Sequence, residues 1–294
     1  MAVKIILMAA AAAIILVIYA LIENGKFRIT RYDHITDKVK KPLTLAVLAD
    51  MHNYSYGREN SRLLEAIRRE KPDVVVSAGD MVTGSVISKG TKESVEFMTA
   101  LAKEFPFVYG CGNHERKLLW DKDNKFPGTS DVYRRALEAA KKETDALMPL
   151  DNETRDFPDY NVKFFGLNLP GRYFRRRQPG VLTVKTIEEM VGKPEKDRLN
   201  ILIGHDPDHF EKYAKWGADL VLSGHIHGGM IALPAGRGLI SPKLTLMPKY
   251  DRGVFKLGKS TMILSGGLGN HTVHLRIFNR AELLIIRISN GNIG

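Results

Sequence analysis

Five short polar motifs in this chain combine aspartate, histidine and asparagine at spacings that suit metal chemistry. They are Asp50-Met51-His52, Gly79-Asp80, Gly112–Glu115, Gly204-His205 and Gly224–His227. Carboxylates and imidazoles are ligands for divalent transition metals. One motif alone is weak evidence, because an Asp-x-His can be structural and a His-x-His can lie exposed on a strand. Five of the nine histidines fall in these motifs, so we interpret the set as one metal site.

The elements that position these motifs are short, buried strands. Apolar runs of the strand type occupy Leu43–Ala49, Asp73–Ser77, Phe107–Tyr109, Val162–Leu167, Leu199–Ile203 and Asp219–Leu222. Amphipathic helices are predicted at Glu59–Glu70, Thr91–Lys103, Asp131–Glu143 and Asp208–Lys215. Strands that alternate with helices predict an α/β fold, in which ligands bind at the carboxyl ends of the strands. Past the last motif, Thr261–Leu264 and Glu282–Ile288 predict a second sheet with antiparallel pairing.

Composition excludes a disordered chain and an internal disulfide, since the 294 residues are 44% hydrophobic and include one cysteine, Cys111. We expect Cys111 to be buried and inert. The net charge of +11 favours anionic partners. The densest basic run holds Arg172, Arg175, Arg176 and Arg177, which we assign to lipid headgroups or a substrate phosphate.

The ordered motifs resemble those of the calcineurin-like metallophosphoesterases, whose pattern is DxH, GDxx, GNH[DE], GHxx and GHxH. The resemblance spans residues 50 to 227, and no motif residue departs from the pattern. It implies a four-layer α/β/β/α sandwich of two mixed β-sheets flanked by helices, and the apolar N-terminal run adds a hydrophobic helix in front. It also implies a dinuclear metal-dependent phosphoester hydrolase, in which a metal-bound hydroxide attacks a phosphodiester or pyrophosphate near a membrane.

The resemblance also assigns roles to individual residues. Asp50, His52 and His227 would bind one divalent ion, and Asn113, His205 and His225 would bind the other. Asp80 would bridge the two ions. Their identity could be Mn, Fe, Zn or Ni, with Mn favoured. His114 would be the catalytic residue that stabilises the developing phosphoryl charge or protonates the leaving oxygen.

The N-terminal run Ile5–Ile22 contains no charge, Gly or Pro. Its length predicts an uncleaved transmembrane anchor over residues 1–24, followed by a basic tether at 25–42 and the catalytic domain at 43–294. A cleaved signal peptide is the alternative. Basic residues on both sides of the run leave the topology open, and we favour an extracytoplasmic catalytic domain.

Partners follow from the same features. We expect a phosphorylated small-molecule or lipid-linked substrate and a membrane, and no nucleic acid. The rival function is a metal-binding scaffold of the same fold with little catalysis. Weaker site candidates are His271 and His274, for substrate contact, and Arg237, for a phosphate. His209 is expected to face outward on a helix.

Overall fold

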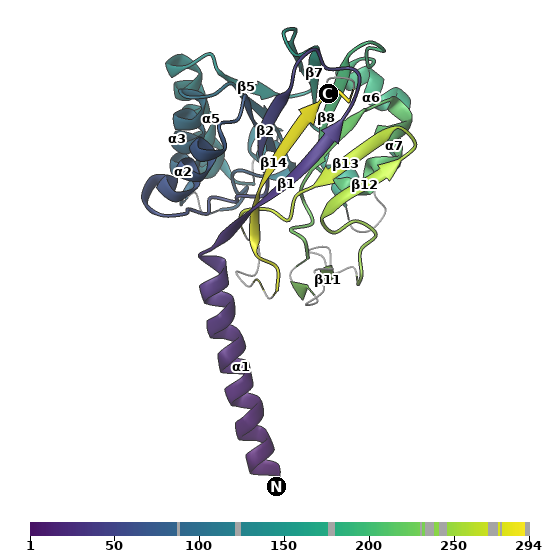
Figure 1. Ribbon diagram of the computed structural model, residues 1–294. Helices are drawn as coiled ribbons and strands as arrows, with labels where there is room; N and C mark the ends of the chain where they lie inside the picture. Colours follow the sequence, from purple (N-terminus) through teal and green to yellow (C-terminus); the bar gives the residue numbers. More distant parts are fainter. Residues whose placement is uncertain are drawn as a thin grey trace.

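The computed structural model describes residues 1–86, 89–120, 125–175, 180–229, 231–232, 238–240, 246–269, 276 and 278–291. Two six-stranded sheets pack against each other (Figure 1). The first has the order β1 (Phe27–Ile35), β14 (Ala281–Ser289), β2 (Leu43–Leu48), β3 (Val74–Ala78), β4 (Phe107–Gly110) and β5 (Leu147–Leu150). The second has the order β12 (Gly253–Leu257), β13 (Ser260–Leu264), β9 (Leu220–Ser223), β8 (Leu199–Gly204), β7 (Val162–Leu167) and β6 (Thr154–Phe157). A short pair, β10 (Ile231–Ala232) and β11 (Gly238–Ile240), lies apart from both sheets.

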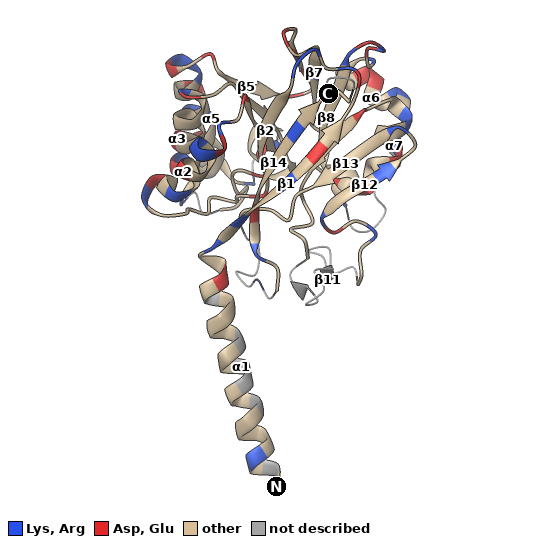
Figure 2. Cartoon of the chain, viewed as in Figure 1, with Lys and Arg blue, Asp and Glu red and all other residues tan. Residues whose placement is uncertain are grey.

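Helices cover the outer faces of both sheets. The first sheet carries α2 (Ser61–Glu70), α3 (Thr91–Ala102) and α5 (Pro127–Glu143), and the second carries α6 (Val184–Val191) and α7 (Phe210–Trp216). A further helix, α4 (Asn113–Trp120), begins directly after β4, and short 3-10 turns lie at η1 (Arg58–Asn60), η2 (Gly171–Phe174) and η3 (Pro207–His209). Many of the charged residues lie on these outer helices and loops (Figure 2).

Alternation along the strands explains the layers. On β2, Leu45 and Val47 point into the core between the sheets, whereas Ala46 and Leu48 point toward the helices. Strand β14 alternates in the same way, with Leu284 between the sheets. A strand presents successive side chains to opposite faces, so a run that is apolar throughout must be covered on both sides. The predicted α/β fold of two mixed sheets flanked by helices is confirmed.

The strands after residue 227 differ from the prediction. Strand β13 forms an antiparallel hairpin with β12 but pairs in parallel with β9. Strand β14 instead joins the first sheet, parallel to β1 and antiparallel to β2. Strands β12, β13 and β14 therefore complete the two large sheets, and only the short antiparallel pair β10–β11 stands apart among the described residues.

The residues assigned to a basic tether also contain regular structure. Phe27–Ile35 form the edge strand β1, which pairs with β14 along its whole length. Its side chains alternate between partly buried and exposed, and Arg28 and Thr30 donate hydrogen bonds to the buried Glu282 of β14. Because one face of an edge strand is wet, its sequence is polar enough to be read as a tether.

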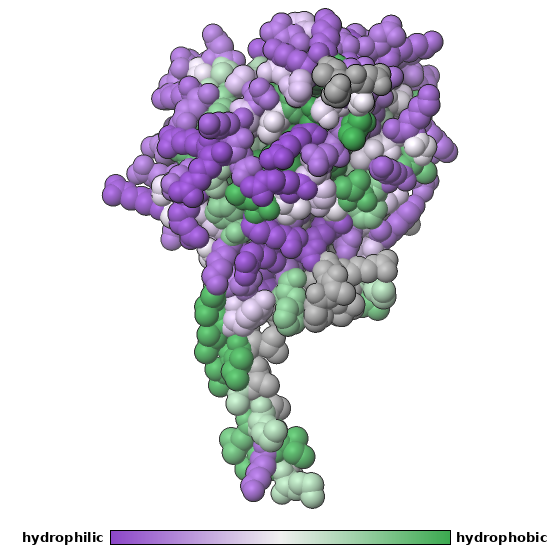
Figure 3. Space-filling view, viewed as in Figure 1, coloured by the Kyte–Doolittle hydropathy of each residue, from purple (hydrophilic) through white to green (hydrophobic). Residues whose placement is uncertain are grey.

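The N-terminal helix α1 (Ala2–Asn24) extends away from the sheets, and its surface is mostly apolar (Figure 3). Its last turns pack on the domain, where Ala20 is buried, the Tyr19 ring lies 5.6 Å from that of Phe278, and Glu23 is ion-paired with Arg280 at 2.7 Å. Over the described residues, none of the helices is long and apolar enough to cross a membrane. The predicted membrane-anchored location is therefore wrong: part of the uncharged run is used in packing.

Candidate metal centre

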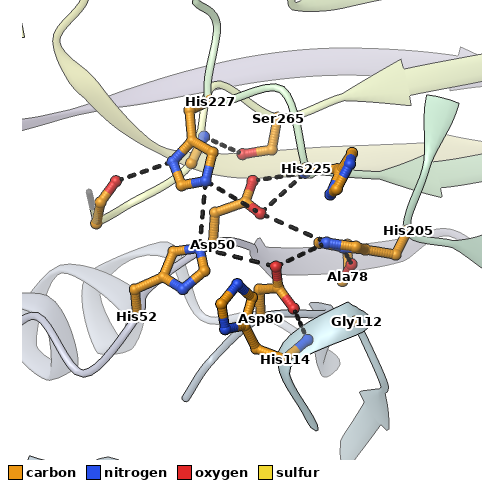
Figure 4. Close-up of polar contacts among 12 residues, drawn as sticks. Asp50, His52, Ala78, Asp80, Gly112, His114, His205, His225, His227 and Ser265 are labelled. Carbon is orange, nitrogen blue, oxygen red and sulfur yellow. Dashed lines mark hydrogen bonds and ion pairs between the residues drawn. The ribbon is translucent and has the colours of Figure 1, made fainter. Parts of the chain in front are cut away.

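The ends of five parallel strands bring the predicted ligand side chains together. Asp50 and His52 follow β2, Asp80 follows β3, and Asn113 follows β4 at the start of α4. From the second sheet, His205 follows β8, and His225 and His227 follow β9. Figure 4 shows that these loops from both sheets face one another across a narrow space.

The first group of ligands consists of Asp50, His52 and His227, whose ligand atoms lie within 4.8 Å of one another. The Nε2 atoms of the two histidines are 3.2 Å apart, and their rings are stacked. His227 Nδ1 lies 3.2 Å from the carbonyl oxygen of Gly269. A carbonyl can only accept, so Nδ1 carries the proton and the Nε2 lone pair faces the Asp50 carboxylate, 3.8 Å away.

The second group consists of Asp80, His205 and His225, with ligand atoms again within 4.8 Å. His205 Nδ1 donates to the carbonyl oxygen of Ala78 at 2.7 Å, so its Nε2 faces Asp80 Oδ2 at 3.0 Å. Nearby, the buried Oδ1 atom of Asn113 has no hydrogen-bond partner among the described residues. Histidines that donate Nδ1–H to a carbonyl while Nε2 faces a carboxylate, together with an unsatisfied amide oxygen, are the donor set of a cation site.

Asp80 lies between the two groups. Its Oδ2 atom is 3.0 Å from His205 Nε2 and 3.7 Å from His52 Nε2, so one oxygen reaches both sides. Its Oδ1 atom accepts a hydrogen bond from the backbone N–H of His114 at 2.8 Å, which fixes the carboxylate. This placement suits a bridging ligand.

Strained backbone marks the ligand turns. Positive φ angles, which non-glycine residues rarely adopt, occur at Asp50 (50°), His52 (49°), Asp80 (56°), His225 (75°) and His227 (54°). Each such residue costs on the order of 1–3 kcal/mol and persists only where surrounding structure enforces it. Five of the seven predicted ligands share this conformation, and strained backbone of this kind clusters at functional sites.

Two glycines allow the turns to pack. A Cβ atom on Gly112 would lie 2.2 Å from Asp80 Oδ1, and one on Gly79, at φ 100°, would lie 2.7 Å from the Gly112 backbone. A larger residue at Gly112 would displace the Asp80 carboxylate, and one at Gly79 would push the Gly112 turn and the His205 ring away. The glycine before each of these ligands is therefore required by close approach of two turns.

Burial shapes the charges of the centre. It raises the pKa of the Asp50 carboxyl to about 7, against the lowering effect of His205. Burial also opposes ionisation of Asp80, but the positive charge of His205 holds its pKa well below the ordinary value. A buried carboxylate is costly unless positive charge compensates it, and divalent cations could supply that charge here.

His114 lies beside the ligands with a defined tautomer. The backbone N–H of Gly84 donates to His114 Nδ1 at 2.9 Å. Nδ1 is thus an acceptor, and the ring proton is on Nε2. The ring packs edge-on against His52, with centroids 4.8 Å apart, and lines the cavity beside the ligands.

That cavity has a volume of about 510 Å³. Besides six of the predicted site residues, it is lined by basic side chains and aromatic rings, most of which the sequence motifs do not indicate. The basic ones are Arg116, Lys117, Lys125 and Arg175, and the aromatic ones are Trp120, Phe126 and Phe174. Arg116 and Lys117 directly follow Glu115 on α4, a position that could have drawn attention to them.

The weaker candidates have varied outcomes. Arg175 lines the cavity, whereas Arg172 stacks on the ring of Tyr173, 4.9 Å from its centroid. His209 is half-buried, edge-on to Tyr173 and Tyr213, and does not simply face outward. Cys111 is a buried free thiol as expected, and burial raises its pKa well above the usual value. The remaining candidates, Arg176, Arg177, Arg237, His271 and His274, lie outside the described residues.

Comparison with known proteins adds a family. The family model described as calcineurin-like phosphoesterase matches residues 43–229. The uncharacterized protein YpbG of Bacillus subtilis is 26% identical over 96% of this chain and 95% of its own length. An uncharacterized metallophosphoesterase of Campylobacter jejuni is 25% identical over 93% of this chain and 67% of its own length. The UDP-2,3-diacylglucosamine pyrophosphatase LpxG of Chlamydia muridarum is 25% identical over 74% of each chain.

Proposed function

The chain belongs to the calcineurin-like phosphoesterase family of metal-dependent phosphoric ester hydrolases, and we propose that it cleaves a pyrophosphate or phosphodiester bond at the centre described above. The observation that carries this proposal is the position of Asp80 Oδ2 within 3.7 Å of His52 Nε2 and 3.0 Å of His205 Nε2. One carboxylate oxygen thus lies between two groups of metal-type ligands. The presence of all seven ligands and of His114 favours a hydrolase over a scaffold.

The two groups would each hold one divalent ion. Asp50, His52 and His227 would hold the first, Asn113, His205 and His225 the second, and Asp80 both. Two such ions would supply Lewis acidity for an in-line displacement and would lower the pKa of a water. The oxygen and imidazole donors suit Mn, Fe, Zn or Ni, and we propose Mn.

His114 supplies a hydrogen bond. Since its Nδ1 accepts from the N–H of Gly84, the imidazole presents Nε2–H to the cavity. We therefore favour stabilisation of the charge that develops on the phosphoryl oxygens over protonation of the leaving oxygen. A donor preorganised in this way is typically worth about 10²–10³ in rate.

A His114→Asn variant tests this role. It should keep its metals, because none of the seven ligands changes, and lose roughly 10²–10³ in kcat. The loss should be similar for esters with good and poor leaving groups, since no proton is transferred. A leaving-group series and metal analysis on the full chain check both points. A loss confined to poor leaving groups would identify a proton donor, and loss of metal would identify a ligand.

The cavity favours a substrate with a second anionic group. A single phosphoryl group is neutralised by the metal centre, which leaves the basic wall of Arg116, Lys117 and Arg175 for further negative charge. Trp120 and Phe126 offer flat apolar surface for a planar or apolar substituent. The relative named as a pyrophosphatase supports the same kind of bond here. We therefore place diphosphate diesters ahead of simple phosphodiesters.

A substrate panel tests this preference. A nucleoside diphosphate sugar, bis(p-nitrophenyl) phosphate and p-nitrophenyl phosphate should be hydrolysed with decreasing kcat/KM. The double variant Lys117→Gln and Arg175→Gln should lose about 10-fold or more on the diphosphate, because two charge-assisted contacts are removed, and far less on the singly charged aryl diester. Lys185→Gln, on the exposed face of α6, is the matched control. Equal losses on both substrates would contradict a second anion subsite.

A further inference from the structure

A buried arginine lies behind the first ligand group. Arg276 is 1% exposed and is among the largest fully buried side chains. Its guanidinium donates to four main-chain carbonyl oxygens, those of Gly266 (3.0 Å), Gly267 (3.2 Å), Gly269 (2.6 Å) and Asn279 (3.2 Å). A buried cation is costly unless its donors are satisfied, so this fan of hydrogen bonds holds the side chain in one geometry.

Three of these carbonyls belong to residues 266–269, which we call the support turn. The turn is bonded to the first ligand group at two points. The N–H of Gly269 donates to the carbonyl of Asp50 at 2.7 Å, and the carbonyl of Gly269 meets His227 Nδ1 at 3.2 Å. A Cβ atom on Gly269 would lie 1.9 Å from the carbonyl oxygen of Met51, so the turn is in tight contact with the Asp50–His52 loop.

Asn279, three residues after Arg276, also holds the His227 loop. Asn279 Nδ2 donates to the carbonyl of His227 at 2.6 Å and also to that of Gly229. Glu282 accepts from the N–H of Gly266 at 2.8 Å, which fixes the start of the support turn. Because Asp50, His52 and His227 all have positive φ, their turns need such external bonds to persist.

We propose that Arg276 is a positioning residue for the metal ion bound by Asp50, His52 and His227. It fixes the Gly269 carbonyl, which in turn sets the tautomer and the orientation of His227, so that Nε2 faces the ion. This inference rests on the ligand assignment of the proposed function. Bonds that orient a metal-binding histidine from behind are typically worth about 10–100-fold in metal affinity.

Charge and positioning make opposite predictions, which gives a sharp test. A guanidinium beside a cation site weakens metal binding by repulsion, so its removal should tighten binding if charge alone mattered. If Arg276 positions His227, its removal should weaken binding. Arg276→Gln removes the charge and most of the donor fork, and Arg276→Lys keeps the charge but loses the fork.

The experiment measures Mn²⁺ binding to the full chain after chelation, by metal analysis at a series of free Mn²⁺ concentrations. In wild type we expect two bound ions. In Arg276→Gln and Arg276→Lys, one ion should bind about 10–100-fold more weakly, while the other changes less than threefold. Arg198→Gln is the matched control, since Arg198 also donates to a main-chain carbonyl, that of Val162, at the far end of the sheet. It should bind both ions normally.

A second measurement covers the case in which Arg276→Gln folds poorly. In a His227→Ala background, Arg276→Lys should have no further effect on Mn²⁺ affinity, because its target imidazole is absent. An additive loss there, tighter binding in Arg276→Gln, or normal binding of both ions in the Arg276 variants would overturn the inference. If wild type itself binds no pair of ions and hydrolyses no ester, the proposed function fails, whatever Arg276 does.

Discussion

The two ligand groups of the centre are held in place by opposite kinds of chemistry. Behind Asp80, the buried carboxylate of Glu115 accepts from the backbone N–H groups of Asp80, Met81 and Gly112 at 2.6–2.9 Å. Behind Asp50 and His227, the buried guanidinium of Arg276 donates to backbone carbonyls. One turn presents its N–H groups inward and the other presents its C=O groups.

This difference teaches how a strained turn is stabilised. A residue with positive φ aims its neighbouring peptide groups in directions that regular secondary structure does not satisfy, so those groups need a dedicated partner. The turn at Asp80 exposes donors and receives an anion, whereas the support turn exposes acceptors and receives a cation. Each group then depends on one buried ionic side chain, and the two dependences can be separated by mutation.

The largest expected effect comes from the residue that both groups share. Asp80→Asn should lose most bound metal and at least about 10⁴-fold in activity, beyond the usual share of a single acid or base, because a neutral amide cannot bridge two cations. Asp73→Asn is the matched control: it precedes β3 at the opposite end and accepts from Thr44 N and Tyr160 Oη. Two bound ions with near-normal turnover in Asp80→Asn would show that the groups are independent.

In the metal-free protein, stability should depend on the protonation of His205 beside Asp80. Burial disfavours the imidazolium of His205, but Asp80 and Asp50 raise the pKa of His205 to about 10. A raised folded-state pKa contributes stability that is complete below about 6.5 and is lost as pH rises through 10. Chelated protein should therefore lose on the order of 3 kcal/mol between pH 7 and 10.

Metal binding requires neutral His205, so loading at pH 8 should release about one proton from this ring. Calorimetric titration with Mn²⁺ in buffers of different ionisation enthalpy measures that proton. Thermal unfolding of the chelated protein from pH 7 to 10 measures the loss of stability. A flat stability profile, with no proton released, would contradict an ion pair between His205 and Asp80 in the metal-free centre.

A smaller effect should follow from changing the anion behind Asp80. Glu115→Gln replaces one acceptor oxygen by an amide group that faces N–H donors, which should cost about 1–3 kcal/mol and weaken binding at the Asp80 group. Urea unfolding and Mn²⁺ titration measure the two outcomes. Glu104→Gln, whose carboxylate pairs with Arg68 on the surface, should change stability by less than about 1 kcal/mol. Equal effects of the two variants would show that Glu115 does not specifically stabilise the turn at Asp80.

The sequence predicted the ligands and the motif that contains Glu115, but it did not indicate the residues that support the His227 group. The ligands were predicted because each follows an apolar run, and parallel strands end at one edge of a sheet. Glu115 lies inside such a motif. Arg276 and Asn279 bond mainly to backbone carbonyls, which leave no residue pattern, so no spacing indicated them. Strand β1 was missed because its wet face makes Phe27–Ile35 polar, and the packing of Ala20 is not visible in an uncharged run.

The smallest effect on stability is expected for a change at Arg280, which lies close to Arg276 in the sequence. Arg280 lies four residues further along, and its guanidinium pairs with Glu23 of α1 at 2.7 and 2.8 Å. Its side chain is 42% exposed, so solvent screens the pair. Arg280→Gln should cost less than about 1 kcal/mol.

Arg280→Gln tests whether His227 is supported by the individual bonds of Arg276 and Asn279 or by the docking of residues 278–280 on α1. Arg280→Gln loosens the contact between α1 and the segment but leaves the bonds of Asn279 to the His227 loop intact. If support comes from individual buried bonds, both Mn²⁺ affinities and kcat should match wild type, while urea unfolding shifts slightly. Weaker Mn²⁺ binding at the His227 group would mean that the docking of α1 is transmitted to the ligands. Arg276 and Arg280 would then both support the His227 group, and the two variants would differ only in how much they weaken Mn²⁺ binding.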